Sequence, residues 1–254
     1  MIFDKNLIER IKSILPYPFI DGESVIDDIP KRLEEKDEEF CFSFDFSPEF
    51  IDRLCYCGYL PMATMITSEI EILLLKLHEK RCILRFKNLH IPKNIKRYCD
   101  DLEFSVDSDL TGVIDGIKKK RFYDCWLYPN ILSSFYGLHN QDKFRTKIHS
   151  IEITHKGRLV AGEVGYSVGA VYTSLSGFYD KNGSGKVQLI ALSKFLESRG
   201  FAFWDLGMSM EYKIDLGAEI VERSVFLEMV KKNRDDKKKL SLKTRRDVRE
   251  LIFN

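Results

Sequence analysis

The sequence predicts an α/β fold, in which helices flank a mixed sheet and a small α+β unit precedes it. Two observations lead to this class. In the second half of the chain, β-rich runs lead into a glycine turn, a helix and a further strand. In the first half, helical apolar spacing surrounds a stretch of period two. With 254 residues, the chain can form one large domain or two smaller ones.

Residues 1–78 are expected to form the small N-terminal domain. Asn6 to Ile14 has helical spacing of apolar residues, and Phe40 to Phe46 alternates phenylalanine with smaller residues, as a strand does. The acidic, polar segment 21–38 between them is expected at the surface. Ser47-Pro48-Glu49 predicts a helix start, because serine caps, proline suits the first turn and glutamate suits the positive end of the dipole.

Residues 79–232 are expected to form the larger domain. Its first part is predicted to hold one short strand and then three helices: Cys82 to Phe86, His90 to Arg97, Leu110 to Lys119 and Ile131 to His139. Its second part is predicted to hold three strands, a glycine turn, a helix and two more strands: Ile148 to Thr154, Arg158 to Ser167, Gly169 to Ser174, Asp180 to Gly185, Lys186 to Arg199, Phe201 to Trp204 and Ile220 to Phe226. This order is that of the acetyltransferase-like fold.

The helix start after the glycine turn is a candidate binding feature. Unpaired backbone N–H groups and the positive end of the helix dipole would face an acyl donor or a phosphate there. Asn182-Gly183-Ser184-Gly185-Lys186 is not a Walker phosphate loop, because Val187 follows the lysine. Asp180 stands where acetyltransferases that use coenzyme A place Arg or Gln. The loop is either a plain helix start or a polar contact for the end of a donor.

The last segment, residues 233–254, is expected to be a charged helix or tail. From Lys231 to Arg249 the chain is a run of charges with hardly any apolar spacing. A solvated surface is the first interpretation, and a nucleic-acid contact is the second. The formal net charge of the whole chain is only +1, so any such contact has to come from local basic patches.

Composition argues against cofactor, metal and membrane functions. Six scattered cysteines include one lone pair, Cys55 and Cys57, without a second pair to complete a zinc site, so reduced structural thiols are expected. The charged residues within Met1 to Leu15 make this segment an amphipathic helix and not a signal peptide. No apolar run is long enough to cross a membrane. The sequence therefore predicts a soluble, cytoplasmic protein without cofactor or metal.

Two residues carry the clearest chemical hypotheses. Asp205 directly follows the apolar run Phe201 to Trp204, and a carboxylate at the end of a buried strand could hold an ammonium group or orient a proton transfer. The alternative is an aspartate that caps a loop through backbone N–H groups. Trp126 could stack on a nucleobase or could simply belong to the core.

An ordered chain of landmarks resembles the leucyl/phenylalanyl-tRNA–protein transferases over roughly residues 50–230. The most specific landmark is His149-Ser150-Ile151-Glu152. The others are Gly58-Tyr59-Leu60-Pro61, Leu89-His90-Ile91-Pro92-Lys93, Trp126-Leu127, Phe135-Tyr136-Gly137-Leu138-His139, Arg158-Leu159-Val160-Ala161-Gly162, Gly165, Gly169, Ser176, Phe178, Lys186, Trp204-Asp205, Leu216-Gly217-Ala218, Arg223 and Phe226.

This resemblance implies a monomeric aminoacyltransferase with an acetyltransferase-like domain. Such an enzyme moves an aminoacyl group from its tRNA to the N-terminal amine of a protein that begins with Arg or Lys, which marks that protein for degradation by the N-end rule. By position, Trp126 would stack on the terminal adenine of the tRNA, and Asp205 would be the catalytic carboxylate. Lys93, Lys96 and Arg97 would contact the tRNA backbone, a salt-sensitive attachment.

The chain departs from the family pattern at several expected substrate-binding positions. Leu175 replaces the family's glutamate, Gly177 its methionine and Gly207 the glutamine that is proposed to assist proton transfer. Met210 replaces an asparagine, and Glu163 stands in the apolar donor pocket, where an unpaired carboxylate would be costly to bury. With Trp126 and Tyr172, the positions Glu163, Leu175, Gly177 and Gly207 make up the predicted substrate-binding set.

Two other functions stay open at this point. One is an acyltransferase that uses another donor, such as a coenzyme A thioester. The other is a non-catalytic relative that binds tRNA or proteins, because the family's glutamate and glutamine are missing.

Overall fold

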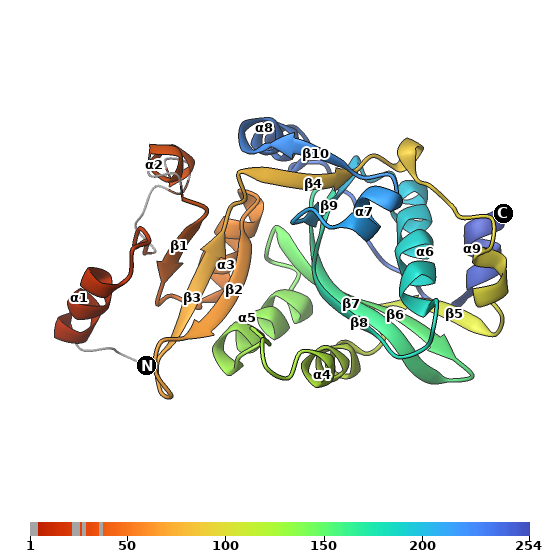
Figure 1. Cartoon of the computed structure of the whole chain (residues 1–254), viewed down its shortest axis with the longest axis horizontal. Helices are drawn as coiled ribbons and strands as arrows, with labels where there is room; N and C mark the ends of the chain where they lie inside the picture. Colours follow the sequence, from red (N-terminus) through yellow and green to blue (C-terminus); the bar gives the residue numbers. More distant parts are fainter. Residues whose placement is uncertain (1–4, 22–25, 27–28, 36–37) are drawn as a thin grey trace.

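A computed structural model describes residues 5–21, 26, 29–35 and 38–254. Two sheets make up the framework, and Figure 1 shows them next to each other along the long axis of the molecule. The smaller sheet has the strand order β1-β3-β2, and the larger one has the order β10-β4-β9-β8-β7-β6-β5-β11. The described part of the chain contains no helix that is long and apolar enough to cross a membrane.

The smaller sheet is antiparallel throughout. β3 lies in the middle and pairs with both β1 and β2. The elements of this region are α1 (Lys5–Ile14), α2 (Ile29–Glu35), β1 (Phe40–Ser43), α3 (Pro48–Tyr56), β2 (Leu60–Met65) and β3 (Glu71–Lys76). The predicted cap is present, because the backbone N–H of Phe50 donates to the hydroxyl oxygen of Ser47. Residues 1–4 of the expected first helix, and 22–25, 27–28 and 36–37 of the expected polar segment, lie outside the described residues.

The larger sheet is mixed, which confirms the predicted α/β class. Its neighbouring strands are antiparallel except β8 and β9, which are parallel and connected by a helix. The strands are β4 (Lys80–Leu84), β5 (Leu102–Val106), β6 (Thr146–His155), β7 (Arg158–Val168), β8 (Val171–Tyr179), β9 (Phe203–Gly207), β10 (Glu219–Glu222) and β11 (Arg246–Asp247). Three antiparallel strands, a glycine turn, a helix and a parallel strand follow one another as the sequence predicted.

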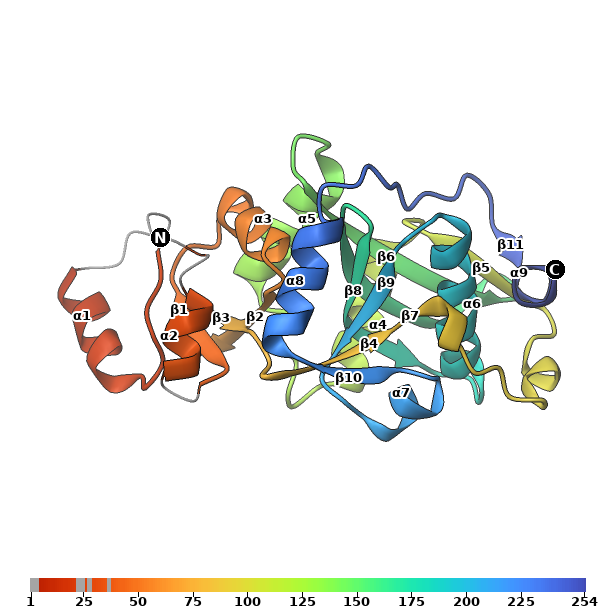
Figure 2. The same cartoon turned by 90° about the horizontal axis from the view of Figure 1, so that it is seen from above.

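Helices cover both faces of the larger sheet. α4 and α5 lie against one face, and α6 lies against the other with α9 packed beside it (Figure 1). The helices are α4 (Leu110–Lys120), α5 (Pro129–Asn140), α6 (Ser184–Ser198), α7 (Glu211–Asp215), α8 (Arg223–Asn233) and α9 (Val248–Phe253), with short 3-10 turns η2 (Phe86–Asn88) and η3 (Ile95–Tyr98). Figure 2 shows α8 running along the junction between the two sheets.

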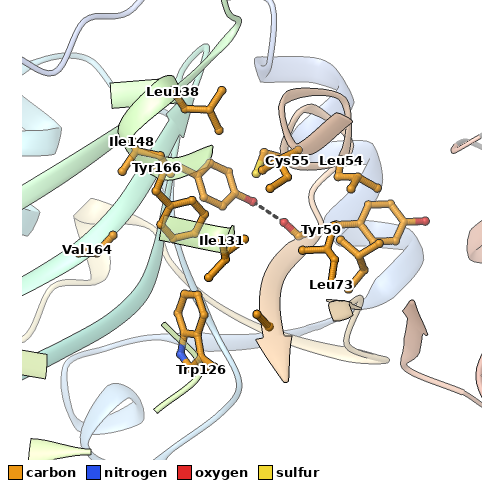
Figure 3. Packing of buried hydrophobic residues seen from close by; sticks show 14 of the residues in the cluster. Leu54, Cys55, Tyr59, Leu73, Trp126, Ile131, Leu138, Ile148, Val164 and Tyr166 are labelled. Carbon is orange, nitrogen blue, oxygen red and sulfur yellow. Dashed lines mark hydrogen bonds between the residues drawn. The ribbon is translucent and has the colours of Figure 1, made fainter. Parts of the chain in front are cut away.

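One hydrophobic core joins the two sheets. It takes Leu54 and Leu73 from the smaller part and Ile148 and Val164 from the larger part, as Figure 3 shows. Across this junction the hydroxyl of Tyr166 donates to the backbone carbonyl of Tyr59 over 2.9 Å. A second core lies between the larger sheet and α6. The two faces of the larger sheet are therefore both buried, each by its own set of apolar residues.

Several predicted elements differ from the structure. Of the helix expected from His90 to Arg97, the structure contains only the turn η3, in which Ile95 is the buried residue. The strand expected up to Phe226 ends at Glu222, and α8 begins directly after it, with Phe226 and Val230 buried at helical spacing.

The expected solvated tail is attached to the domain. β11 pairs with β5, and Val248, Leu251 and Ile252 bury one side of α9. These three residues have helical i, i+3, i+4 spacing, but they follow a long charge run that gives no sign of it.

Candidate functional site

The two parallel strands of the larger sheet separate part of the way along their length. β8 pairs with β9 only over Val171–Thr173 and Phe203–Asp205. Beyond this point β8 pairs with β7 alone, and β9 pairs with β4. The facing edges then carry backbone groups that no neighbouring strand uses. Polar side chains from β7, β8, β9, α6 and α7 gather at this divergence, which makes it the candidate site.

Glu163 on β7 is the central side chain of the site. It is only 4% exposed, yet its carboxylate has no cation within hydrogen-bonding distance among the residues that the structure describes. Its three donors are neutral: the hydroxyls of Tyr172 (3.0 Å) and Ser174 (2.7 Å), and the side-chain amide of Gln188 (2.9 Å). Burial raises the pKa of Glu163 to about 7, although these bonds act in the opposite direction. The group can therefore take up and release a proton near neutral pH.

A β-bulge places Ser174 beside this carboxyl. The register between β7 and β8 shifts so that Gly165 faces Ser174 and Val164 faces Ser176, which leaves Leu175 as the extra residue. Leu175 packs on the α4–α5 side, whereas the Ser174 hydroxyl reaches Glu163. The indole N–H of Trp204 donates to the same hydroxyl over 2.8 Å. Ser174 thus links β9 to Glu163 where the two strands part.

Gln188 is a site residue that the sequence reasoning missed. It lies in the second turn of α6. Its side chain is polar and buried, whereas most of the other buried side chains on that helix are apolar. The Ser184 hydroxyl fixes the start of the helix by donating to the carbonyl of Val160 on β7 (3.2 Å). A glutamine on the inward face of an otherwise apolar helix was the available signal, because a buried amide needs a partner.

The short helix α7 contributes a buried cation and a tyrosine. The ammonium of Lys213 donates to the carbonyls of Leu206 (2.6 Å) and Met208 (2.7 Å), and burial lowers its pKa. Burial and then the charge of Glu163 raise the pKa of Tyr212. The positive charge of Lys213 acts to lower the pKa of Glu163, against the larger effect of burial. α7 therefore supplies the electrostatic surroundings of the carboxyl without bonding to it.

Asp205 lies in a different environment from the one expected of a reacting group. It is 0% exposed and accepts two bonds from the Arg81 guanidinium, each 2.8 Å long. The Thr173 hydroxyl (3.0 Å) and the backbone N–H of Gly207 (2.9 Å) complete its hydrogen bonding. These four bonds occupy both oxygens, so the geometry argues against direct proton transfer by Asp205. The Arg81–Asp205 pair joins β4 to β9, and the bond from Thr173 adds β8.

Two predicted glycines border the site in different ways. Gly177 faces Glu163 across β7 and β8, and a Cβ at this position would lie 3.1 Å from the Cβ of Glu163. Its lack of a side chain therefore allows β7 and β8 to pack closely beside Glu163. Gly207 ends β9 with a φ of +72°, a conformation that favours glycine.

Trp126 belongs to the core on the other face of the sheet. The residue, labelled in Figure 3, is 9% exposed. Its ring packs edge to face on Phe135, with 6.0 Å between the ring centres. It shares this core with Val164, the residue after Glu163 on β7. Because consecutive strand residues point to opposite faces, the structure does not bring Trp126 to Glu163.

The His149-Ser150-Ile151-Glu152 motif joins β6 to the loop that precedes α4. His149 contacts Asp107 through Nδ1 (2.8 Å) and Ser167 through Nε2 (2.9 Å). The Glu152 carboxylate accepts bonds from the hydroxyls of Ser105 and Ser150 and from two backbone N–H groups just before α4. Its specificity as a landmark thus comes from a dense set of buried polar contacts.

The three predicted tRNA contacts lie near the start of α6. Lys93, Lys96 and Arg97 are all exposed. Tyr98, which follows them in η3, packs against the backbone of Gly183 at the entry to α6. The basic residues thus lie close to the helix that supplies Gln188. Among the residues that the structure describes, no group of three or more His, Cys, Asp or Glu side chains could hold a metal ion.

Comparisons with known proteins agree with this chain's landmarks. The family model described as leucyl/phenylalanyl-tRNA protein transferase matches residues 83–231. The leucyl/phenylalanyl-tRNA–protein transferase of Maridesulfovibrio salexigens is 30% identical over 158 residues, which are 60% of this chain and 64% of that protein. That of Pseudomonas putida is 25% identical over 202 residues, 78% of this chain and 86% of that protein.

Similarity to solved structures is weak. The C-terminal domain of a putative lysylphosphatidylglycerol synthetase from Agrobacterium fabrum aligns with a TM-score of 0.41 and 13% identity, over 84% of this chain and 66% of that one. The chain also spans slightly less than two thirds of the relative from Maridesulfovibrio salexigens.

Proposed function

The chain belongs to the leucyl/phenylalanyl-tRNA–protein transferase family, and on this premise we propose that it is an aminoacyltransferase whose reacting carboxyl is Glu163. In the reaction, the N-terminal amine of an acceptor protein attacks the ester carbonyl of an aminoacyl-tRNA. An amide bond forms, the ester bond breaks, and the tRNA leaves with a free 3′ hydroxyl. The single observation that carries the assignment is the buried Glu163 at the divergence of β8 and β9, with a pKa of about 7.

Glu163 suits the proton transfers that this reaction needs. Its ionised form accepts the proton that the attacking amine loses, and the resulting acid returns a proton to the departing oxygen. A modest base is sufficient, because an α-amino group has a reference pKa of about 7.7–8.0. The ester is already activated, so the remaining work is orientation of the amine and stabilisation of the developing oxyanion.

Gln188 supports this role of Glu163. The family's glutamate and glutamine are Leu175 and Gly207 in this chain, yet a carboxyl and an amide lie 2.9 Å apart in the site as Glu163 and Gln188. We assign Gln188 as a positioning residue, together with Tyr172 and Ser174. This chain therefore has a carboxyl and an amide in its site, as the family does, but they come from β7 and α6.

The other predicted site residues take supporting roles in the proposal. Asp205 positions the strands through Arg81, and Trp126 supports the sheet from its other face. Lys93, Lys96 and Arg97 contact the tRNA backbone. The acceptor begins with Arg or Lys, the enzyme works as a monomer in the cytoplasm, and the product is marked for degradation.

A coenzyme A thioester fits the start of α6 less well. Asp180 lies just before the glycine-containing turn that leads into α6, and its carboxylate already pairs with Lys120 at 2.7 Å. The Lys120 charge is thus already engaged and is not available to pair with a pyrophosphate. The aminoacyl ester remains the donor that the site supports best.

Transfer of radiolabelled amino acids from charged tRNA tests the proposal. The donors are leucyl-, phenylalanyl-, lysyl- and arginyl-tRNA, and the acceptor is a peptide that begins with Arg, beside the same peptide with an acetylated N-terminus. We expect transfer to the free amine only, and a rate about 100- to 10,000-fold lower for Glu163→Gln. Absence of transfer from every donor would overturn the function, and an unchanged rate in a folded Glu163→Gln variant would overturn the role of the carboxyl.

A further inference from the structure

The end of α4 and the loop after it form a basic, aromatic segment, Lys118–Tyr123. Its first four residues are Lys118, Lys119, Lys120 and Arg121, and its last two are Phe122 and Tyr123. Phe122 is 79% exposed and Tyr123 is 97% exposed, more than any other large hydrophobic side chain that the structure describes. Their rings touch edge to face with 5.2 Å between centres, so ring faces remain open to solvent. Such exposure marks a contact surface.

Contacts connect this segment to the candidate site. Lys120 pairs with Asp180 at the end of β8, and the hydrogen bond from Lys120 and the charge of Lys119 lower the pKa of Asp180. Tyr212 on α7 responds to Arg121 as well as to Glu163, whose charges shift its pKa in opposite directions. The charges of both the segment and the reacting carboxyl therefore act on Tyr212.

The charge balance of the segment favours an anionic partner. Of the nearby carboxylates, Asp180 pairs with Lys120, and Asp124 lies 3.6 Å from Arg121. Lys118 and Lys119 have no ion-pair partner among the described residues. Two unneutralised lysines beside two open aromatic rings match the phosphates and bases of a nucleic acid strand whose bases are unpaired.

We propose that Lys118–Tyr123 binds the unpaired 3′ end of the tRNA, just before the nucleoside that carries the acyl ester; this inference rests on the proposed function. The rings of Phe122 and Tyr123 stack on bases, and Lys118 and Lys119 contact phosphates. A duplex would offer the phosphates but not the base faces, and an apolar protein segment would leave the cations without partners.

Two donors separate this surface from the reaction itself. One is the complete aminoacyl-tRNA, and the other is an aminoacyl ester of adenosine, which lacks every nucleotide before the terminal one. For Phe122→Leu/Tyr123→Leu, which removes the ring faces but keeps apolar side chains, we expect an increase of about tenfold or more in KM for the tRNA donor. The kcat and the kinetics with the minimal donor should not change.

Binding of uncharged tRNA, followed by fluorescence anisotropy, gives a readout that does not need catalysis. Lys118→Ala/Lys119→Ala should reduce the slope of log K against log salt by about 0.7 for each phosphate that the variant no longer neutralises. Lys231→Ala/Lys232→Ala is the matched control, since these lysines also lie exposed in the last turn of a helix, α8, and should have no effect.

The two proposals fail in different ways. If the ring variant binds tRNA as tightly as the unaltered protein, the surface assignment is overturned and another occupant, such as an apolar protein segment, takes its place. If the ring variant impairs both donors equally, the rings act on the reaction and the assignment is also overturned. If the unaltered protein transfers from neither donor, the proposed function fails, whereas the anisotropy still decides whether the segment binds RNA.

Discussion

Two of the buried carboxyl groups in the larger sheet, Asp205 and Glu163, differ in their partners. Asp205 meets the guanidinium of Arg81 in a buried ion pair with two hydrogen bonds. Glu163 receives only neutral donors, and burial raises its pKa to about 7. A proton can therefore be exchanged at Glu163 near neutral pH. The chemistry of the site follows from this difference between the two residues.

Burial of Glu163 should make stability depend on pH. Its folded pKa of about 7 exceeds its ordinary value of 4.5, so the folded state binds the proton more tightly. This stabilisation is complete below pH 4.5 and disappears as the pH rises through 7. Between pH 4 and 8, the free energy of unfolding should fall by about 3 kcal/mol relative to Glu163→Gln. Urea denaturation of both proteins checks this, and parallel pH curves would contradict it.

The sequence singles out Glu163 but not its surroundings. Its position in the resemblance predicted a donor pocket with a costly carboxylate, and the structure supplies three hydrogen bonds that reduce this cost. These partners come from β8 and α6. The bulge at Leu175 cannot be obtained from local spacing, and the helical spacing that points Gln188 inward does not show that it meets Glu163. Asp205 was placed correctly at a buried strand, but its partner Arg81 is 124 residues away in sequence.

At the scale of elements, the divergence of β8 and β9 creates the site and the Arg81–Asp205 pair stabilises its closed end. Arg81 comes from β4, Asp205 from β9, and Thr173 of β8 bonds to the same carboxylate. The pair therefore holds three strands together next to the point where two of them separate.

Breaking this pair should cost more than removing it. Asp205→Ala leaves the Arg81 guanidinium buried without its partner, and we expect a loss of about 3–5 kcal/mol in the free energy of unfolding. Arg81→Met/Asp205→Leu removes both charges and should recover most of that loss. Chemical denaturation measures both variants. If the folded double variant had a much lower kcat for transfer at an unchanged KM for tRNA, Asp205 would be a catalytic residue. Its assignment as a positioning residue would then be wrong.

Elements with a clear local pattern were predicted well, and elements that depend on distant partners were not. The β6–β7 hairpin and α6 follow strong periodicity and turn signals, and both are present. β2 and β3 were missed, because their apolar runs lack a clean alternation. β5 was also missed, because it is an inner strand that pairs with β6, which is distant in sequence. α8 was partly predicted as a strand, because Val225 and Phe226 follow the apolar pair Ile220 and Val221 of β10 after only a few residues.

At the scale of the whole molecule, the shared core makes the two sheets support each other. Leu54 and Leu73 from one part pack in the same cluster as Ile148 and Val164 from the other. The boundary predicted near residue 78 coincides with the end of the smaller sheet, since β3 ends at Lys76 and β4 begins at Lys80. The division into two domains remains a prediction, and the common core implies that they unfold together.

Shortening one side chain of this core tests the coupling. Ile148→Ala should lower the free energy of unfolding by about 2–5 kcal/mol, because less apolar surface is buried and a cavity remains. Because the core is common, amide hydrogen exchange should increase in β3 as well as in β6. Ile153→Ala, which shortens a side chain of the core on the α6 side, is the comparison variant. Faster exchange confined to β6 would contradict a shared core.

The pH dependence of single-turnover transfer tests the central assignment most directly. The complete aminoacyl-tRNA is held in excess with a saturating Arg-initiated peptide, and the rate is measured from pH 5 to 9 for the unaltered protein and Glu163→Gln. Because the ionised carboxyl is the base, the rate should rise with pH through about 7 in the unaltered protein. Glu163→Gln should be slower at every pH and lack this rise, keeping only the rise that belongs to the amine. An identical profile in both proteins would contradict the account.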